Sequence, residues 1–189
     1  MTTIYFMRHS KSIKPNNIKN NDSLQLQNEK WILSEEGELI AKEKSLLEEL
    51  NNFDVVFSSN YARAIGTAKY FSNEINIDER FNERKFGIDN WNQLPSDFEN
   101  KQKEDFDYKL NNGESLNEVI KREEDALKDI LNNYNGKKIL IVGHSTAMAA
   151  LFSRLCNNKD YFSITWNYCE TFKLLFNEKN EFKEINNIQ

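Results

Sequence analysis

The amino-acid sequence predicts an α/β protein with three layers, in which a mostly parallel central sheet is flanked by helices. Short apolar segments typical of strands alternate along the chain with segments of helical periodicity, which is the pattern of parallel strands joined by crossover helices. Residues 138–142 form an almost unbroken apolar run, as expected of a strand buried on both faces. The 189 residues contain no internal repeat and no linker, so we expect a single domain over residues 1–189.

The first half of the chain is expected to open with a strand at residues 4–7, followed by a long polar surface loop over residues 10–30. Ser34 is a suitable N-cap for a helix over residues 35–50, because acidic residues occupy the first turn of that segment. The other elements predicted in this half are a strand at 54–57, a helix at 62–72 and a brief strand at 75–77.

The second half is dominated by a long amphipathic helix that begins after Gly113-Glu114-Ser115 and ends at Asn135-Gly136. Its buried side is predicted to carry Leu116, Val119, Ile120, Leu127, Ile130, Leu131 and Tyr134. The other elements expected in this half are a helix within residues 95–110, the strand at 138–142, a helix at 146–155, and an edge hairpin of strands 170–176 and 182–185.

Composition and charge exclude several classes of partner. The net charge of −5 and the absence of a basic cluster argue against nucleic acid. No apolar run is long enough to span a bilayer and the first residues lack a basic leader, so we expect a cytoplasmic protein with no membrane partner. Cys156 and Cys169 have no metal-binding or redox spacing and are expected to be reduced thiols. No metal and no other cofactor is predicted.

The chain contains only two histidines, and both follow predicted strands. In open α/β sheets ligands bind beyond the carboxyl ends of the strands. His9 comes two residues after the first strand, and His144 comes two residues after the strand at 138–142. Arg8, at the end of a buried strand, indicates an anionic ligand, since a guanidinium is rarely placed there without one.

The segment at residues 58–64 repeats this arrangement. A strand ends, a polar turn follows, and Arg63 enters the first turn of a helix. The free N–H groups and the positive end of the helix dipole favour a phosphate at such a position. Arg63 could therefore share an anion with the start of its own helix.

The motifs around these residues, taken in order along the chain, resemble those of the histidine phosphatase superfamily, also called phosphoglycerate mutase-like. The family opens with a strand followed by Arg-His-Gly, and its later motifs occur here in the same order from residue 4 to about residue 176. The matching segments are Arg8-His9-Ser10, Leu33 to Gly37, Ser58-Ser59 through Arg63-Ala64 to Thr67-Ala68, Glu83 to Gly87, Gly113-Glu114-Ser115 and Val142-Gly143-His144.

The resemblance implies a role for each matched residue. His9 is the implied nucleophile, whose imidazole attacks phosphorus and holds the phosphoryl group until water or a second acceptor takes it. Arg8, Arg63 and His144 are implied to bind the three non-bridging oxygens. Glu83 is the implied general acid and base, although Glu79 is close enough in sequence to compete for the role. No metal is required by this chemistry.

Three departures from the family pattern affect the binding residues. Ser10 replaces the glycine after the nucleophile, where a side chain restricts the backbone and adds a hydroxyl beside the phosphate. The polar residue usually found seven positions after the motif arginine falls at Pro15, so Asn16 becomes the candidate for that contact. Ser145, at the start of the following helix, is a further candidate for substrate binding. Trp91 comes two residues later than the tryptophan that follows Phe-Gly in the family.

We therefore predict a metal-independent phosphomonoester hydrolase that acts on a small-molecule phosphate ester through a phosphohistidine. The alternatives are a phosphoglycerate-type phosphomutase and a non-catalytic member that binds phosphorylated ligands. The short span between Glu83 and His144, with its acidic-leaning residues 97–109, offers no obvious basic platform for a second phosphate and favours the phosphatase. Neither the natural substrate nor the oligomeric state follows from the sequence. Aromatic candidates for the mouth of the site are Trp31, Trp91, Trp166 and Tyr168.

Overall fold

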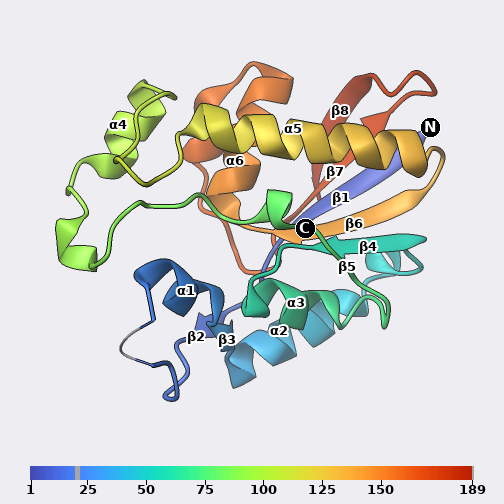
Figure 1. Cartoon of the computed structure of the whole chain (residues 1–189). Helices are drawn as coiled ribbons and strands as arrows, with labels where there is room; N and C mark the ends of the chain where they lie inside the picture. Colours follow the sequence, from blue (N-terminus) through green and yellow to red (C-terminus); the bar gives the residue numbers. More distant parts are fainter. Residues whose placement is uncertain (20–21, 189) are drawn as a thin grey trace.

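A computed structural model describes residues 1–19 and 22–188 of the chain (Figure 1). Its central sheet has six strands in the order β5-β4-β6-β1-β7-β8, of which β5, β4, β6 and β1 are parallel and β7 and β8 antiparallel to their neighbours. These strands are β1 (Thr2–Arg8), β4 (Val55–Ser58), β5 (Asn76–Ile77), β6 (Lys138–Gly143), β7 (Thr171–Phe176) and β8 (Phe182–Ile188). A separate pair is formed by β2 (Ser12–Ile13) and β3 (Ile32–Leu33).

The α-helices lie on the two faces and at one end of this sheet. They are α1 (Leu24–Glu29), α2 (Glu35–Ser45), α3 (Ala62–Ala68), α4 (Phe98–Glu104), α5 (Leu116–Asn133) and α6 (Ser145–Cys156). Short 3₁₀ turns are η1 (Glu48–Leu50), η2 (Glu79–Phe81), η3 (Trp91–Gln93) and η4 (Lys159–Phe162). Among the described residues, no helix combines the length and the apolar character needed to cross a membrane.

Alternate side chains of the strands fill two cores, one on each face of the sheet. In β1, Phe6 faces the core beneath α5 and α6, whereas Met7 faces the core beneath α2 and α3. Figure 1 shows α5 and α6 on one side of the sheet and α2 and α3 on the other. The predicted three-layer α/β fold with a mostly parallel sheet is confirmed.

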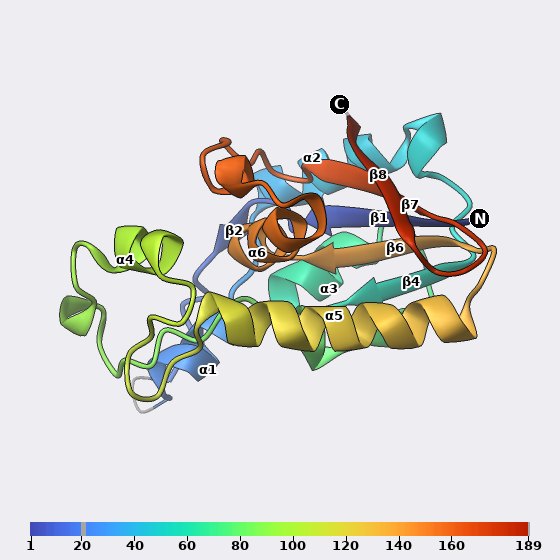
Figure 2. The same ribbon diagram turned by 90° about the horizontal axis from the view of Figure 1, so that it is seen from above.

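The register of the parallel strands brings their carboxyl ends to one edge. Met7 in β1 and Ser58 in β4 both pair with Val142 in β6, and Arg8 pairs with Gly143. Figure 2 shows β4, β6 and β1 side by side, with α1 and the α4 segment at the end toward which β4 and β6 point. The residues that follow these strands are therefore next to one another.

The prediction of a loop over residues 10–30 is wrong, because the segment contains β2 and α1. Ser23 caps α1, accepting a hydrogen bond from the N–H of Leu26 at 3.2 Å. No residue of α1 is fully buried, so the helix leaves no apolar stripe in the sequence by which it could be recognised. Residues 20 and 21 of the predicted loop lie outside the described part of the chain.

Three predicted helices end earlier than expected, each for a local reason. At the end of α2 the Ser45 hydroxyl turns back to the carbonyl of Lys42, at 2.7 Å. After Ala68, the end of α3, the hydrogen bonds tighten to the three-residue spacing, as from the Tyr70 N–H to the Thr67 carbonyl. The helix predicted within residues 95–110 is only α4, since the Asp105 carboxylate accepts from the Asp107 N–H and forms a turn.

Glu123 is an unexpected member of the buried face of α5, alongside the predicted apolar residues. Its side chain lies in the interior, and in the described structure one of its carboxylate oxygens has no hydrogen-bond partner. Burial raises the pKa of Glu123 to about 8; Arg122 opposes this shift, while Glu83 and Glu114 add to it. The folded protein therefore holds this carboxyl in its neutral form up to about that pH.

Replacing Glu123 with glutamine should raise the free energy of unfolding at pH 8 by on the order of 5 kcal/mol, with a much smaller effect at about pH 4.5. An unfolded chain releases this proton at about pH 4.3, whereas the folded protein retains it until about pH 8. The wild-type protein consequently loses stability as pH rises between these values, and the glutamine variant lacks this loss. Urea unfolding of both proteins at three pH values measures the difference. If the difference in free energy of unfolding between the two proteins were the same at all three pH values, a neutral buried Glu123 would be contradicted.

Candidate active site

His9 lies directly beyond β1, and only 8% of its surface is exposed. Its Nδ1 is 2.7 Å from the carbonyl of Ser10, so Nδ1 carries the proton and donates it to that oxygen. On the other side of the ring, the Nε–H of Arg63 donates to Nε2 at 3.0 Å. These two hydrogen bonds define the tautomer, in which the unprotonated Nε2 accepts the hydrogen bond from Arg63.

The surroundings of His9 keep the imidazole neutral. Burial lowers its pKa to about 3, with Arg63 and Arg8 acting in the same direction and the Ser10 hydrogen bond against it. A neutral imidazole with an available Nε2 lone pair is a nucleophile at any pH above that value.

His144 begins α6 as its N-cap residue and is 1% exposed. Its ring centroid is 5.1 Å from that of His9, and its Nε2 is 2.9 Å from the hydroxyl oxygen of Ser59. Nδ1 of His144 is buried and has no hydrogen-bond partner within the described residues. Burial, with His9 and Arg63 acting in the same direction, lowers the pKa of His144 well below its ordinary value. Two imidazoles therefore meet at the ends of β1 and β6.

Arg63 and Arg8 bring two guanidinium groups to the same place. Arg63 is 6% exposed, and its Nη1 donates to the carbonyl of Asn28 at 2.6 Å. Arg8 donates through Nη1 to the carbonyl of Trp166, its Cζ lies 5.1 Å from the ring centroid of Tyr168, and its Nε has no partner among the described residues. Neither side chain forms an ion pair in the described part of the chain. Both cations thus retain the capacity to bind an anion.

Glu83 lies at the start of α6, the helix that His144 caps. One carboxylate oxygen accepts the Arg84 N–H at 2.9 Å, and the other faces the Thr146 N–H at 3.3 Å. Glu83 is also near enough to Arg8 and Arg63 to oppose the lowering of their pKa values by burial. Glu79, the alternative considered from the sequence, is exposed on η2. The geometry thus favours Glu83 over Glu79.

The three residues suggested for substrate binding have different surroundings. Ser10 is buried, its hydroxyl donates to the Gly37 carbonyl at 2.6 Å, and its N–H donates to the Thr67 hydroxyl at 2.9 Å. Ser10 thus joins the end of β1 to α2 and α3, and it is not among the described residues with positive φ, which accounts for a serine where the family has glycine. Asn16 lies on an exposed turn and makes no hydrogen bond to His9, Arg63 or His144 within the described structure. Ser145 is the half-buried first residue of α6.

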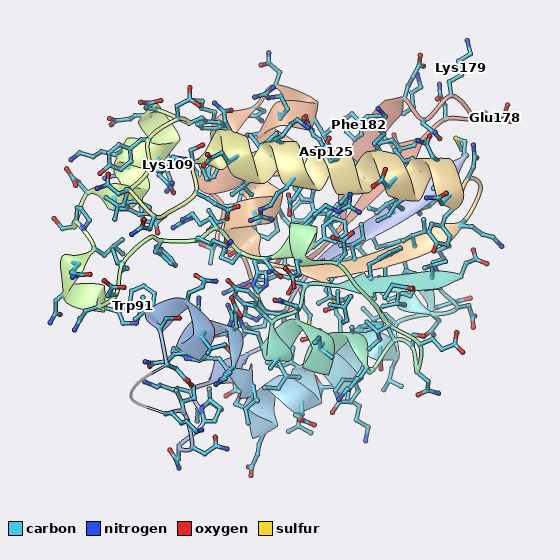
Figure 3. The ribbon with its side chains drawn as sticks, viewed as in Figure 1. Trp91, Lys109, Asp125, Glu178, Lys179 and Phe182 are labelled. Carbon is cyan, nitrogen blue, oxygen red and sulfur yellow. The ribbon has the colours of Figure 1, made fainter. Side chains whose placement is uncertain are left out.

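The aromatic candidates for the mouth are not gathered at one place. Trp166 packs in the core against Phe172, with ring centroids 5.0 Å apart. Trp91 is exposed on η3, far out on the α4 segment (Figure 3). Tyr168 is exposed, and its ring lies against Arg8, whose guanidinium also donates to the carbonyl of Trp166.

Sequence reasoning missed Gln25, Asn28 and Tyr61. The first two belong to α1, and the Gln25 side-chain amide donates to the Tyr61 hydroxyl at 2.6 Å. Ser23 ahead of a run without glycine or proline was the available signal for α1. Tyr61 stands inside the motif that carries Arg63, but its position there does not by itself mark it as a site residue.

The described residues contain no group of three or more histidine, cysteine or acidic side chains arranged to hold a metal ion. What they do contain is two histidines and two arginines without an ion pair at the carboxyl ends of parallel strands, groups whose chemistry suits a phosphate-like anion. The family model of the histidine phosphatase superfamily (branch 1) matches residues 4–188, and the chain belongs to this superfamily.

Solved structures of the same fold include several phosphatases. A phosphoserine phosphatase from Entamoeba histolytica, in complex with 3-phosphoglyceric acid, has a TM-score of 0.76 and 21% identity over 100% of this chain and 98% of its own. A mycobacterial glucosyl-3-phosphoglycerate phosphatase, in complex with inorganic phosphate, has a TM-score of 0.77 and 15% identity over 99% and 95% of the two chains. YhfR from Bacillus stearothermophilus has a TM-score of 0.73 and 22% identity over 97% and 95%. The comparison with curated proteins gives no match.

Proposed function

We propose that this protein hydrolyses small-molecule phosphate monoesters through a phosphohistidine on His9, without a metal. The observation that carries the proposal is the Nε2 lone pair of a neutral, buried His9, which has Arg63 at 3.0 Å and His144 and Arg8 around it. The known structures of the same fold that hold 3-phosphoglyceric acid or inorganic phosphate support a ligand of this chemical class.

The reaction follows from this arrangement in two transfers. His9 Nε2 attacks phosphorus in line, the bond from phosphorus to the ester oxygen breaks, and that oxygen takes a proton from Glu83. Water then attacks the phosphohistidine, Glu83 takes the proton of the water, and the bond from nitrogen to phosphorus breaks to release phosphate. Arg63, which donates to Nε2 in the structure, exchanges that acceptor for a phosphate oxygen when substrate binds.

The segment between Glu83 and His144 favours water over a second phosphorylated acceptor. A mutase has to hold a bisphosphorylated ligand, which requires additional free cations near the site. Lys101 pairs with Asp97 at 2.9 Å, and Lys109 pairs with Glu118. These two lysines are therefore already paired with carboxylates, and on this ground we assign the chain to the phosphatase side of its superfamily.

Hydrolysis of para-nitrophenyl phosphate by the wild-type protein in excess chelator tests this proposal. We expect full activity in chelator, together with a phosphoprotein that survives alkali and is lost in acid, because a phosphohistidine behaves in this way and a phosphoserine does not. Vanadate, which imitates five-coordinate phosphorus, should inhibit competitively. An absolute metal requirement, or transfer of phosphate to a second sugar-like acceptor in preference to water, would contradict the proposal.

A further inference from the structure

Tyr61 touches two of the residues around His9. It is the N-cap residue of α3, and its side chain is completely buried. The ring of Tyr61 meets the His144 imidazole edge to face, with centroids 4.6 Å apart and an angle of 62°. The Cζ atom of Arg63 lies 4.8 Å from the centroid of the same ring. One aromatic ring therefore contacts both a histidine and an arginine of the site.

The polar atoms of Tyr61 extend these contacts in two directions. Its backbone N–H donates to the Ser59 hydroxyl at 3.3 Å, and that oxygen lies 2.9 Å from His144 Nε2. Its hydroxyl accepts the Gln25 amide N–H at 2.6 Å. Burial raises the pKa of the hydroxyl, so the ring remains a neutral phenol. Tyr61 thus links α1, α3 and the start of α6.

We propose that Tyr61 is a positioning residue, which holds the Arg63 guanidinium and the His144 imidazole in their phosphate-binding places and fastens α1 beside them. The inference rests on the proposed function, because it assigns Arg63 and His144 to the phosphate. The electron-rich face of a tyrosine ring attracts a guanidinium, and its edge and face also suit an imidazole. A rigid ring between the two groups limits their relative motion, and misplacement of catalytic groups by about 1 Å costs up to about 100-fold in rate.

The hydroxyl of Tyr61 has a separate role from the ring, because it helps to hold α1 at the site. None of the six residues of α1 is fully buried, so polar contacts add to its attachment. Two of these contacts reach the site. The Gln25 amide donates to the Tyr61 hydroxyl, and Arg63 Nη1 donates to the Asn28 carbonyl. Losing the first contact leaves α1 to be ordered when substrate binds, which weakens binding without altering the chemical step.

Two substitutions separate these tasks, with para-nitrophenyl phosphate as substrate and vanadate as inhibitor. Tyr61→Leu removes the ring, so kcat/KM should fall by about 10- to 100-fold, with a slower single-turnover phosphorylation of His9 and weaker vanadate inhibition. Tyr61→Phe keeps the ring and should restore kcat while KM rises about threefold. Gln25→Ala should raise KM by the same factor, and the double variant should show no further increase, because both changes break one hydrogen bond.

Phe176→Leu is the matched control, since Phe176 is an equally buried aromatic at the opposite end of the sheet, paired with Thr2. It should lower the melting temperature as Tyr61→Leu does but keep wild-type kinetics. If Tyr61→Leu does not fold, Tyr61→Met, which retains unbranched volume, takes its place. If Tyr61→Leu or Tyr61→Met folds and has the same kinetics as Phe176→Leu, Tyr61 is not a positioning residue. If the KM effects of Tyr61→Phe and Gln25→Ala add in the double variant, the hydrogen bond between these residues does not hold α1 at the site. Failure of the proposed function would instead be visible in the wild-type protein, as absence of a phosphohistidine.

Discussion

Replacing His9 with alanine should lower kcat for para-nitrophenyl phosphate by about 10⁴-fold or more. The reason lies in the tautomer of its ring: Nδ1 carries the proton and Nε2 has the lone pair, which becomes the nucleophile when Arg63 exchanges it for a phosphate oxygen. An alanine retains the anion-binding groups but has no atom to form the covalent intermediate. The variant should therefore still bind vanadate or phosphate while losing turnover. Steady-state kinetics and phosphate competition measured on one preparation check both expectations.

His144→Ala is the matched control for this experiment. It removes an imidazole of comparable burial whose ring lies 5.1 Å from His9 and leaves the proposed nucleophile in place. We expect it to reduce turnover by about 10²- to 10³-fold, as the loss of one stabilising donor does, and to retain a phosphohistidine. If the phosphoprotein persisted in His9→Ala and disappeared in His144→Ala, the nucleophile would be His144 and the assignment of His9 would be wrong.

The pH dependence of the wild-type protein follows from the same environment. The pKa of His9 is lowered to about 3, so the free protein has an unprotonated nucleophile above about that pH. An acid limb in kcat/KM above about pH 5 must then come from another group, since kcat/KM reports the ionisation of the free enzyme and substrate.

The parts of the fold that the sequence predicts are those driven by apolar burial. β1, β6 and α5 each leave a periodic or continuous apolar pattern, and the strand ends place His9 and His144 without any alignment. The register then adds Arg63, because β4 stops level with β6. These residues could be found because their position is a consequence of strand geometry.

What the sequence did not predict depends on polar contacts between distant segments. The helix α1 is held at the site by Gln25 and Asn28, neither of which contributes to an apolar face. Glu123 occupies a position of α5 that periodicity marks as buried, yet a carboxylate there conflicts with the usual rule for charged groups. The Ser10 hydroxyl meets a carbonyl of α2 that is 27 residues away. Such pairings depend on the assembled fold and leave no local pattern.

Replacing Glu83 with glutamine should have an effect that depends on the leaving group. An amide keeps the shape of the carboxyl, but its single oxygen can accept only one of the Arg84 and Thr146 N–H groups, and it cannot transfer a proton. Nitrophenolate leaves without protonation, so phosphorylation of His9 by para-nitrophenyl phosphate should slow by less than about tenfold. An alkoxide needs a proton to leave, so with an alkyl ester such as glycerol phosphate the same step should slow by about 10²- to 10⁴-fold.

The second half of the reaction gives the Glu83 variant a distinct signature. With water no longer deprotonated by Glu83, hydrolysis of the phosphohistidine becomes limiting, and rapid mixing with para-nitrophenyl phosphate should show a burst of about one equivalent of nitrophenolate. Phosphohistidine should accumulate in the same samples. Glu79→Gln, which changes the exposed carboxylate of η2, should show neither the burst nor the selective loss. If Glu83→Gln slowed the phosphorylation of His9 equally with both esters, the Glu83 carboxylate would serve to hold α6 and His144 in place. Another group would then have to supply the proton.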